Sequence, residues 1–195
     1  MGKIILTAVL LLLASSVHAA ESIRWDSAAL SYQSIDLDGD KFTGIGLSGE
    51  KSINDDFFIT GNYTSVSDDV RLYGYSVDFD LNTLSAGMGY HYALSANTSL
   101  FSVASYERIN LKASFAGSSS TTNENGFGLK AGARSLITEN IQLSAAVKYS
   151  VIADNSDTGF SVSGMYNFTN NISTSISYNT ENDIDSVSLS AIYFF

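Results

Sequence analysis

The sequence predicts an all-β fold, a ten-stranded antiparallel transmembrane β-barrel. Segment after segment alternates an apolar face with a face of Ser, Gly and Lys, aromatic residues gather near the ends of these segments, and the chain opens with an apolar run of export-signal length. The alternation is clearest in the last segment, where Ser186, Ser188 and Ser190 lie between Val187, Leu189, Ala191, Tyr193 and Phe195. In lipid every backbone polar group must be paired internally, so such strands close into a barrel.

We expect the strands at residues 25–36, 41–52, 56–66, 80–93, 98–110, 125–136, 141–152, 158–168, 172–180 and 186–195. Most of these spans have about the 9–11 residues that a tilted strand needs to cross a bilayer, and their number is even, as in bacterial barrels. A barrel of eight strands is the alternative. It requires two long loops, for which the available gaps are Ser67–Phe79 and Lys112–Glu124.

The connections between the expected strands alternate between two kinds. The short polar turns are Ile53-Asn54-Asp55, Ser95-Ala96-Asn97, Thr138-Glu139-Asn140 and Thr169-Asn170-Asn171. The longer connections carry most of the acids, namely Asp36, Asp38, Asp40, Asp68, Asp69, Asp78, Asp80, Glu124, Asp154, Asp157, Glu181, Asp183 and Asp185. Asp38-Gly39 is typical of a two-residue hairpin turn. The acids around it resemble the start of a calcium loop without the remaining EF-hand spacing, so no metal site is predicted, and weak binding of divalent cations is the alternative.

Residues 1–19 have the pattern of a cleaved signal peptide, because Lys3 precedes an apolar run at Ile4–Leu13 and small residues precede Ala20. Removing them leaves 195 − 19 = 176 residues, a single barrel domain at 20–195. The chain has no cysteine for a disulfide or thiolate site and no proline, which laddered strands exclude. The expected mature net charge, 9 − 20 = −11, argues against a nucleic-acid partner. No cofactor is predicted.

Outward-facing aromatic residues lie near the ends of the expected strands, with aliphatic residues between them, as the two interfaces of a bilayer select. One group is Tyr90, Tyr92, Tyr166, Phe168, Tyr193 and Phe195, and the other is Tyr63, Phe127, Tyr149, Phe160 and Tyr178. With the signal peptide and the terminal Tyr193-x-Phe195, the chain resembles small outer-membrane β-barrel proteins of Gram-negative bacteria, a porin-like or OmpX-like class. The resemblance implies an outer-membrane location, contact with membrane lipid and lipopolysaccharide, and recognition of the last strand by the barrel-assembly machinery. It also implies periplasmic short turns and external long connections.

The charged residues expected to line the lumen are Lys130, Arg134, Lys148, Glu50 and His91. Such residues at membrane depth pair with one another or line water. We expect Arg134 to contact Glu50 across the barrel, and Lys130 and Lys148 to lie side by side without acid partners. His91 is expected near the short turns with no Asp to orient it, so no catalytic residue is predicted.

Two functions follow for a barrel without a catalytic constellation. The first is a non-enzymatic, narrow, weakly anion-preferring pore for small solutes, because the expected lumen face is rich in Ser, Gly and Ala. The second is a structural or surface-interaction barrel with a filled lumen. An outer-membrane enzyme that modifies lipid A or cleaves peptides like an omptin is the remaining alternative. No solute, ligand or oligomeric state is predicted.

Overall fold

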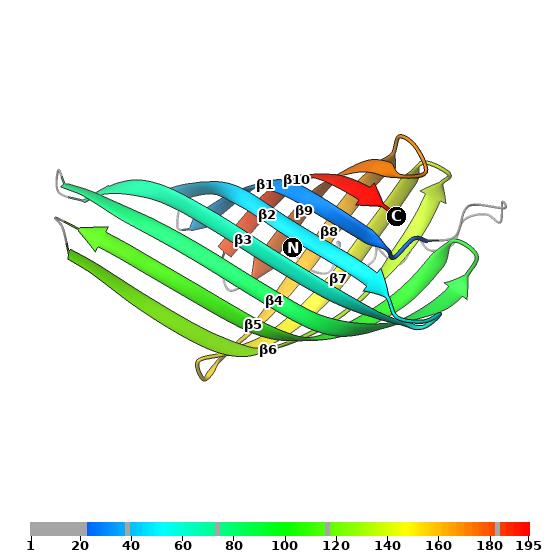
Figure 1. The fold of residues 1–195 in the computed structure, drawn as a ribbon, viewed down its shortest axis with the longest axis horizontal. Helices are drawn as coiled ribbons and strands as arrows, with labels where there is room; N and C mark the ends of the chain where they lie inside the picture. The colour runs from blue at the N-terminus through cyan, green and yellow to red at the C-terminus, as the bar shows by residue number, and fades with distance from the viewer. Residues whose placement is uncertain (1–22, 38–39, 73–74, 116–117, 182–183) are drawn as a thin grey trace, which may run out of the picture.

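The structure is a computed structural model that describes residues 23–37, 40–72, 75–115, 118–181 and 184–195. These residues form a closed barrel of ten antiparallel strands (Figure 1), which confirms the predicted count and makes the alternative of eight wrong. The strands are β1 (Ser27–Leu37), β2 (Asp40–Ser52), β3 (Phe57–Leu72), β4 (Tyr75–Ser95), β5 (Thr98–Phe115), β6 (Ser118–Thr138), β7 (Ile141–Ile152), β8 (Asn155–Asn167), β9 (Ile172–Glu181) and β10 (Ile184–Phe194). Within the described ranges, no helix is long and apolar enough to cross a membrane.

Each strand pairs with its neighbours in the chain, and β1 pairs with β10 to close the barrel. The connections β2–β3, β4–β5, β6–β7 and β8–β9 are short and lie together at one end, which we call the short-turn end (Figure 1). The opposite end carries the other hairpins and is the long-hairpin end. The expected signal peptide, residues 1–19, and the expected turn Asp38-Gly39 lie outside the described residues.

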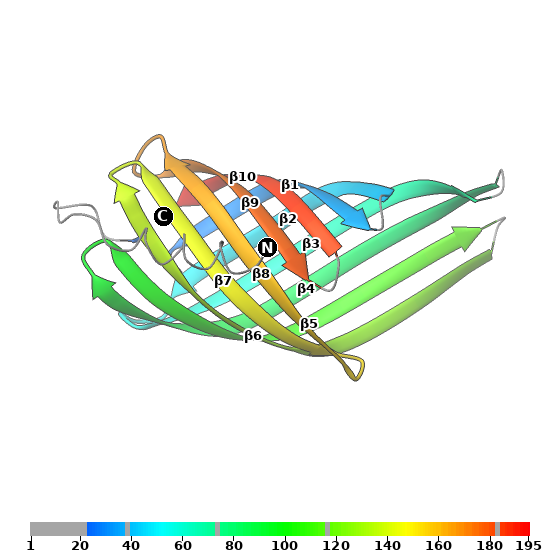
Figure 2. The ribbon, with the colours of Figure 1, turned by 180° about the vertical axis from the view of Figure 1, so that it is seen from behind.

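Two hairpins, β3–β4 and β5–β6, extend well beyond the other strands at the long-hairpin end (Figures 1 and 2). The pairing of β2 with β3 ends at Ser67, and the pairing of β6 with β7 ends at Gly126. The pairings β3–β4, β4–β5 and β5–β6 continue further, to Leu72↔Tyr75, Val77↔Phe115 and Phe115↔Ser118. We call this four-stranded sheet the extension. The gaps Ser67–Phe79 and Lys112–Glu124 were therefore wrongly read as loops.

In β5 the polar and apolar faces exchange places between the barrel wall and the extension, and in β6 both faces of the extension are polar, which is why the loop prediction failed. In the wall, aliphatic residues such as Leu129, Val147, Ile176 and Leu189 are 50–62% exposed, which agrees with the expected aliphatic outer face between the aromatic residues. In the extension part of β5, the same outward face carries Arg108, Asn110 and Lys112, and the inward face carries Ile109, Leu111 and Ala113. Strand alternation thus persists with its polarity reversed.

The connection between β7 and β8 is also shorter than expected. It consists of Ala153 and Asp154, whose φ angles are 49° and 67°. Two consecutive positive φ values are those of a type I′ turn, which matches the twist of a hairpin. Asp157, expected in a loop, therefore lies within β8, and several other acids of the expected loops are strand residues, namely Asp36, Asp80, Glu124, Glu181 and Asp185.

Candidate functional site

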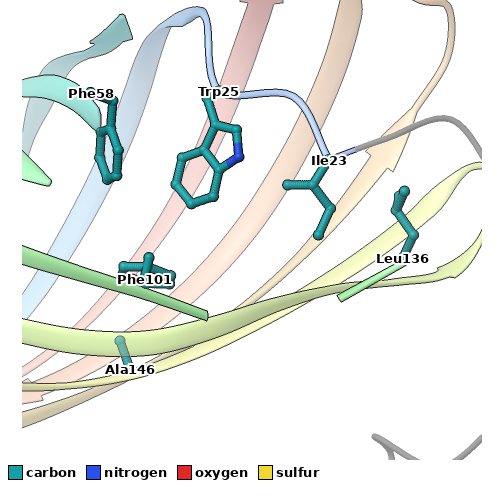
Figure 3. Packing of buried hydrophobic residues seen from close by; sticks show 6 residues of the cluster. All are labelled: Ile23, Trp25, Phe58, Phe101, Leu136 and Ala146. Atoms are coloured by element: carbon teal, nitrogen blue, oxygen red, sulfur yellow. The ribbon is translucent and has the colours of Figure 1, made fainter. Parts of the chain in front are cut away.

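The short-turn end of the lumen is filled by an apolar cluster built around the chain segment that precedes β1. Trp25 is 6% exposed although it lies before the first strand, because its segment runs inside the barrel wall (Figure 3). Its ring and Ile23 point toward residues of β3, β5, β6 and β7 across the lumen. We call the group the Trp25 cluster, and its members are Ile23, Trp25, Phe58, Phe101, Leu136 and Ala146.

His91 belongs to the same region, near the short turns as expected, and its ring packs on Trp25. The two rings are stacked, with centroids 4.3 Å apart and an interplanar angle of 6°. Phe58 is fully buried, and its ring centroid lies 4.7 Å from that of Trp25. Gly89 makes room for it, since a Cβ atom there would lie 2.2 Å from the Phe58 ring. His91 therefore has a packing role in this cluster.

Arg134 of β6 and Glu50 of β2 form a bidentate ion pair directly above the Trp25 cluster. The Nη1–Oε2 and Nη2–Oε1 distances are 2.8 and 2.6 Å. The guanidinium also lies 4.1 Å from the ring centroid of Trp25, in cation–π geometry. Because β2 and β6 are not neighbours in the barrel, this contact bridges the lumen, as the sequence predicted. A bidentate pair fixes both side chains in direction as well as in distance.

Lys148 has two carboxylate partners, so the expectation that it lacks acids is wrong. Its Nζ lies 3.5 Å from Glu107 Oε1 and 3.6 Å from Glu181 Oε2. The hydroxyl of Ser105 donates to Glu107 at 2.6 Å, and that of Ser150 donates to Glu181 at 2.6 Å. These hydroxyls hold the two carboxylates beside the ammonium group, and the resulting cluster joins β5, β7 and β9.

Lys130 pairs in register with Lys148 across β6 and β7, so the two lysines lie side by side as expected. Among the described residues, no carboxylate lies within 4.0 Å of Lys130. The Arg134–Glu50 bridge and the two lysines with their acid partners together contain three cations and three carboxylates, whose formal charges cancel. They are Lys130, Arg134, Lys148, Glu50, Glu107 and Glu181.

Uncharged side chains elsewhere in the lumen hydrogen-bond to one another. The Nε2 atom of Gln33 donates to Ser31 Oγ and Thr64 Oγ1, each at 3.2 Å. The hydroxyls of Ser144 and Ser163 lie 2.6 Å apart on β7 and β8. Within the described ranges, no three His, Asp or Glu side chains come together as metal ligands. The arrangement is a set of paired charges and hydroxyls rather than a nucleophile with a base.

Sequence reasoning missed three residues of this site. Glu107 and Glu181 could have been found, because extending the alternation of Ser105 and Asn179 by one step places both carboxylates on the lumen face. The inward position of Trp25 had no such signal, since the segment before β1 has no period of its own.

Comparisons with known proteins concern the whole barrel. A family model described as the outer membrane protein beta-barrel domain matches residues 5–168. The attachment invasion locus protein Ail of Yersinia pestis is similar with a TM-score of 0.48 and 17% identity, over 89% of this chain and 100% of that chain. Neisserial surface protein A is similar with a TM-score of 0.46 and 19% identity, over 88% of this chain and 96% of that chain. The NanC porin is similar with a TM-score of 0.50 and 10% identity, over 85% of this chain and 99% of that chain. No curated protein sequence matches. At such identities the likeness to solved structures concerns the fold alone.

Proposed function

The chain belongs to the outer membrane protein β-barrel domain family and resides in the bacterial outer membrane, and we propose that it is a barrel with a closed lumen that acts at the cell surface. The observation that carries this proposal is the filling of the short-turn end. There the Trp25 cluster and the Arg134–Glu50 bridge occupy the path that a solute would take. In this proposal the short-turn end faces the periplasm, and the long-hairpin end faces outward.

The extension supports a surface role. Residues 118–124 of β6 pair with β5 on one side only, since pairing with β7 begins at Gly126 and the backbone carbonyl of Asn125 accepts a hydrogen bond from Ala153. An unpaired strand edge offers its backbone N–H and C=O groups to a strand of another protein. This edge, SSSTTNE, carries neither proline nor lysine, the residues that usually protect an edge from such pairing. We propose that the partner is an extended segment of an external protein.

We also propose that the barrel is not an enzyme. His91 lies at the short-turn end with its ring against Trp25, far from the end where external substrates arrive. The lumen carboxylates Glu50, Glu107 and Glu181 are engaged by Arg134 and Lys148. A general base needs an orienting partner and access to substrate, and these contacts support a structural role instead.

A narrow pore is the second candidate, and one observation favours it. The lumen face of β8, β9 and β10 carries small hydroxyl side chains, which fill space poorly. They are Ser161, Ser163, Ser173, Ser175, Ser177, Ser186, Ser188 and Ser190. Passage of a solute would then require the Trp25 cluster to move. The cancelling charges of these six lumen residues argue against the anion preference that unpaired lysines would have produced.

Two further proposals concern how the chain reaches the membrane. Residues 1–19 are a signal peptide that is removed before Ala20, which leaves Trp25 close to the new N-terminus. The C-terminal segment is read by the barrel-assembly machinery, and the side chains of Tyr193 in β10 and of Phe195 directly after it are 54% and 59% exposed.

Single-channel recording in planar bilayers tests the closed lumen. The wild-type barrel should show no steady conductance, Trp25→Ala should open transient or steady currents, and Trp25→Phe should stay closed because a ring remains in the cluster. Steady conductance of the wild type would refute the closed barrel and favour the pore.

The surface role is tested by removing residues 112–121, which shortens the β5–β6 hairpin between the paired residues Leu111 and Thr122. Cells that display the wild-type barrel should bind immobilised serum or matrix proteins, and cells that display equal amounts of the shortened barrel should not. Equal binding by both would contradict a role for the extension.

A further inference from the structure

The inward face of the extension carries a patch of apolar side chains. Even-numbered residues of β6 face the lumen, since a Cβ atom at Gly128 would meet the side chains of Glu107 and Ser105. The register of β3, β4 and β5 continues this face into the extension. Toward its tip, the extension has no other strand beside it in either view (Figures 1 and 2). We call the apolar residues of this face the inner patch, and its members are Val66, Phe79, Leu81, Ile109, Leu111 and Ala113.

The inner patch is closed toward β3 and open toward β6. Val66 on β3 is 2% exposed, whereas Leu111 on β5 is 41% exposed. The register partner of Leu111 on β6 is Thr122, and the next inward residue of β6 is Ser120, so only short side chains lie beside the open part of the patch. Residues 118–124 of β6 have no strand on their other side, and we call them the free edge. The uncovered part of the patch therefore lies one strand away from the free edge.

The barrel end of the free edge is acidic. Glu124 is the inward residue there, and among the described residues no lysine or arginine lies within 4.0 Å of its carboxylate. The turn between β7 and β8 meets the edge at this point, because the N–H of Ala153 donates to the carbonyl of Asn125, and Asp154 is the next residue of that turn. The whole chain has a formal net charge of −10. This end of the edge therefore favours a basic partner, and a second copy of the chain would bring like charge to it.

We infer that the free edge and the inner patch together bind an extended protein segment, which adds to β6 as an antiparallel strand. A basic residue of this segment lies opposite Glu124, and large apolar residues lie opposite Thr122 and Ser120. The edge supplies backbone hydrogen bonds to any extended chain, and cross-strand pairs select its side chains. Antiparallel pairing is the more stable kind. This inference rests on the surface role proposed above and adds the chemistry of the partner.

The inner patch gives the reason for the large apolar residues. Strands separated by one strand lie about 10 Å apart, and short side chains on the strand between them let large side chains from both sides meet. Large apolar side chains opposite Thr122 and Ser120 thus cover Leu111. In an antiparallel strand that begins at the barrel, every second residue faces inward, so the inward residues follow the order basic, apolar, apolar.

Fluorescence anisotropy with labelled peptides tests this order on the refolded barrel in detergent micelles. The lead peptide is Thr-Lys-Thr-Leu-Thr-Leu-Thr with both ends blocked. The second peptide is the same sequence reversed, so its composition and charge are identical. The third has Glu in place of Lys, and the fourth has Ser in place of both Leu residues.

The lead peptide should bind most tightly to the wild type. An opposite-charge pair across two strands contributes up to about fivefold in affinity, so the Glu peptide, which brings like charge, should bind at least about fivefold more weakly. The Ser peptide should bind about tenfold more weakly because it leaves the inner patch uncovered. The reversed peptide should also bind more weakly, since in an antiparallel strand it places Leu opposite Glu124.

Variants of the barrel locate the binding. Glu124→Lys should reverse the preference for the Lys peptide over the Glu peptide, and Leu111→Ser should remove the preference for Leu over Ser. The matched controls Glu139→Lys and Leu94→Ser change an exposed acid and an exposed leucine at the short-turn end and should behave like the wild type. The barrel that lacks residues 112–121 should bind none of the peptides. Circular dichroism of each variant confirms that the barrel is folded.

Four results would overturn the inference. Equal binding of all four peptides, lost in the shortened barrel, would leave the free edge as a docking site without selection by the inner patch. Binding that Glu124→Lys and Leu111→Ser leave unchanged would place the peptides elsewhere on the barrel. A barrel dimer that the shortened variant cannot form would show that a second copy of the chain occupies the edge. If no peptide binds, the chemistry inferred for the partner is wrong, and the deletion test with serum and matrix proteins still decides the surface role.

Discussion

Breaking the bridge between Glu50 and Arg134 should destabilise the barrel strongly. The two side chains are 21% and 17% exposed, and two hydrogen bonds of 2.6 and 2.8 Å join them. Glu50→Gln leaves a guanidinium enclosed above Trp25 without its counter-ion. Removing one partner of a buried pair costs about 3–5 kcal/mol. Because each side chain keeps some contact with solvent, we expect the lower end, about 3 kcal/mol.

The double variant Glu50→Gln with Arg134→Met completes a double-mutant cycle, which measures the interaction between the two side chains apart from the effect of each single substitution. It removes the unpaired charge as well, so its cost should be smaller than the sum of the two single costs, with a coupling free energy of about 2 kcal/mol. Equilibrium unfolding by denaturant in lipid vesicles measures all four proteins. Trp25 is the one tryptophan of the sequence and lies against Arg134, so its emission reports on this part of the lumen.

The pair Asp26–Lys51 at the short-turn end is the matched control. Its side chains are 25% and 54% exposed, so Asp26→Asn should cost at most about 1 kcal/mol. The hydrogen bonds from the Lys51 ammonium and the Ser52 backbone N–H lower the pKa of Asp26 below 3.8. Its contribution to stability is therefore present above that pH and is lost as the pH falls through the lower folded-state pKa. If the coupling free energy of Glu50 and Arg134 is no larger than that of Asp26 and Lys51, the bridge does not stabilise the barrel strongly and the reasoning is refuted.

Two further predictions test the wall and its packing. Val147→Arg should lower the free energy of unfolding in lipid by about 2–4 kcal/mol, and Ser144→Arg on the lumen face by far less, so equal costs would reject the assignment of faces. Gly89→Ala should cost about 1–3 kcal/mol because its Cβ would meet the Phe58 ring at 2.2 Å, whereas at Gly61 the nearest atom lies 3.9 Å away and Ala should be tolerated. Denaturant titrations measure both pairs, and a neutral Gly89→Ala would contradict the tight packing of Phe58.

Period-two alternation was enough to predict the strand count and the outward face, because bilayer and lumen impose opposite demands on successive residues. The same reasoning failed where the surroundings change. Beyond Tyr106 the outward side chains of β5 become polar, and the apolar Leu111 takes a position on the opposite face, where it is 41% exposed. Read with the polarity of the wall, such a stretch looks like a loop. A test for alternation of either polarity would have found the extension.

The lumen contacts depended on register as well as on face. Glu50 and Arg134 were predicted together because both could be counted from short turns, which fix depth. Glu181 ends a strand, and its depth beside Lys148 depends on the tilt accumulated over several strands. A single sequence does not show the combined tilt of several strands. The inward course of the segment around Trp25 depends on the space that the finished barrel leaves, which no local pattern encodes.

The position of Trp25 also bears on the order in which the barrel forms. This residue lies near the beginning of the chain, yet it packs against Phe58, Phe101 and Arg134, and more than half of the sequence separates it from the last of these. Contacts between distant parts of a chain form slowly, because the intervening segment must be ordered first. We expect sheet formation to precede the change in Trp25 emission during refolding. The first residues of the described chain would then be among the last to reach their place.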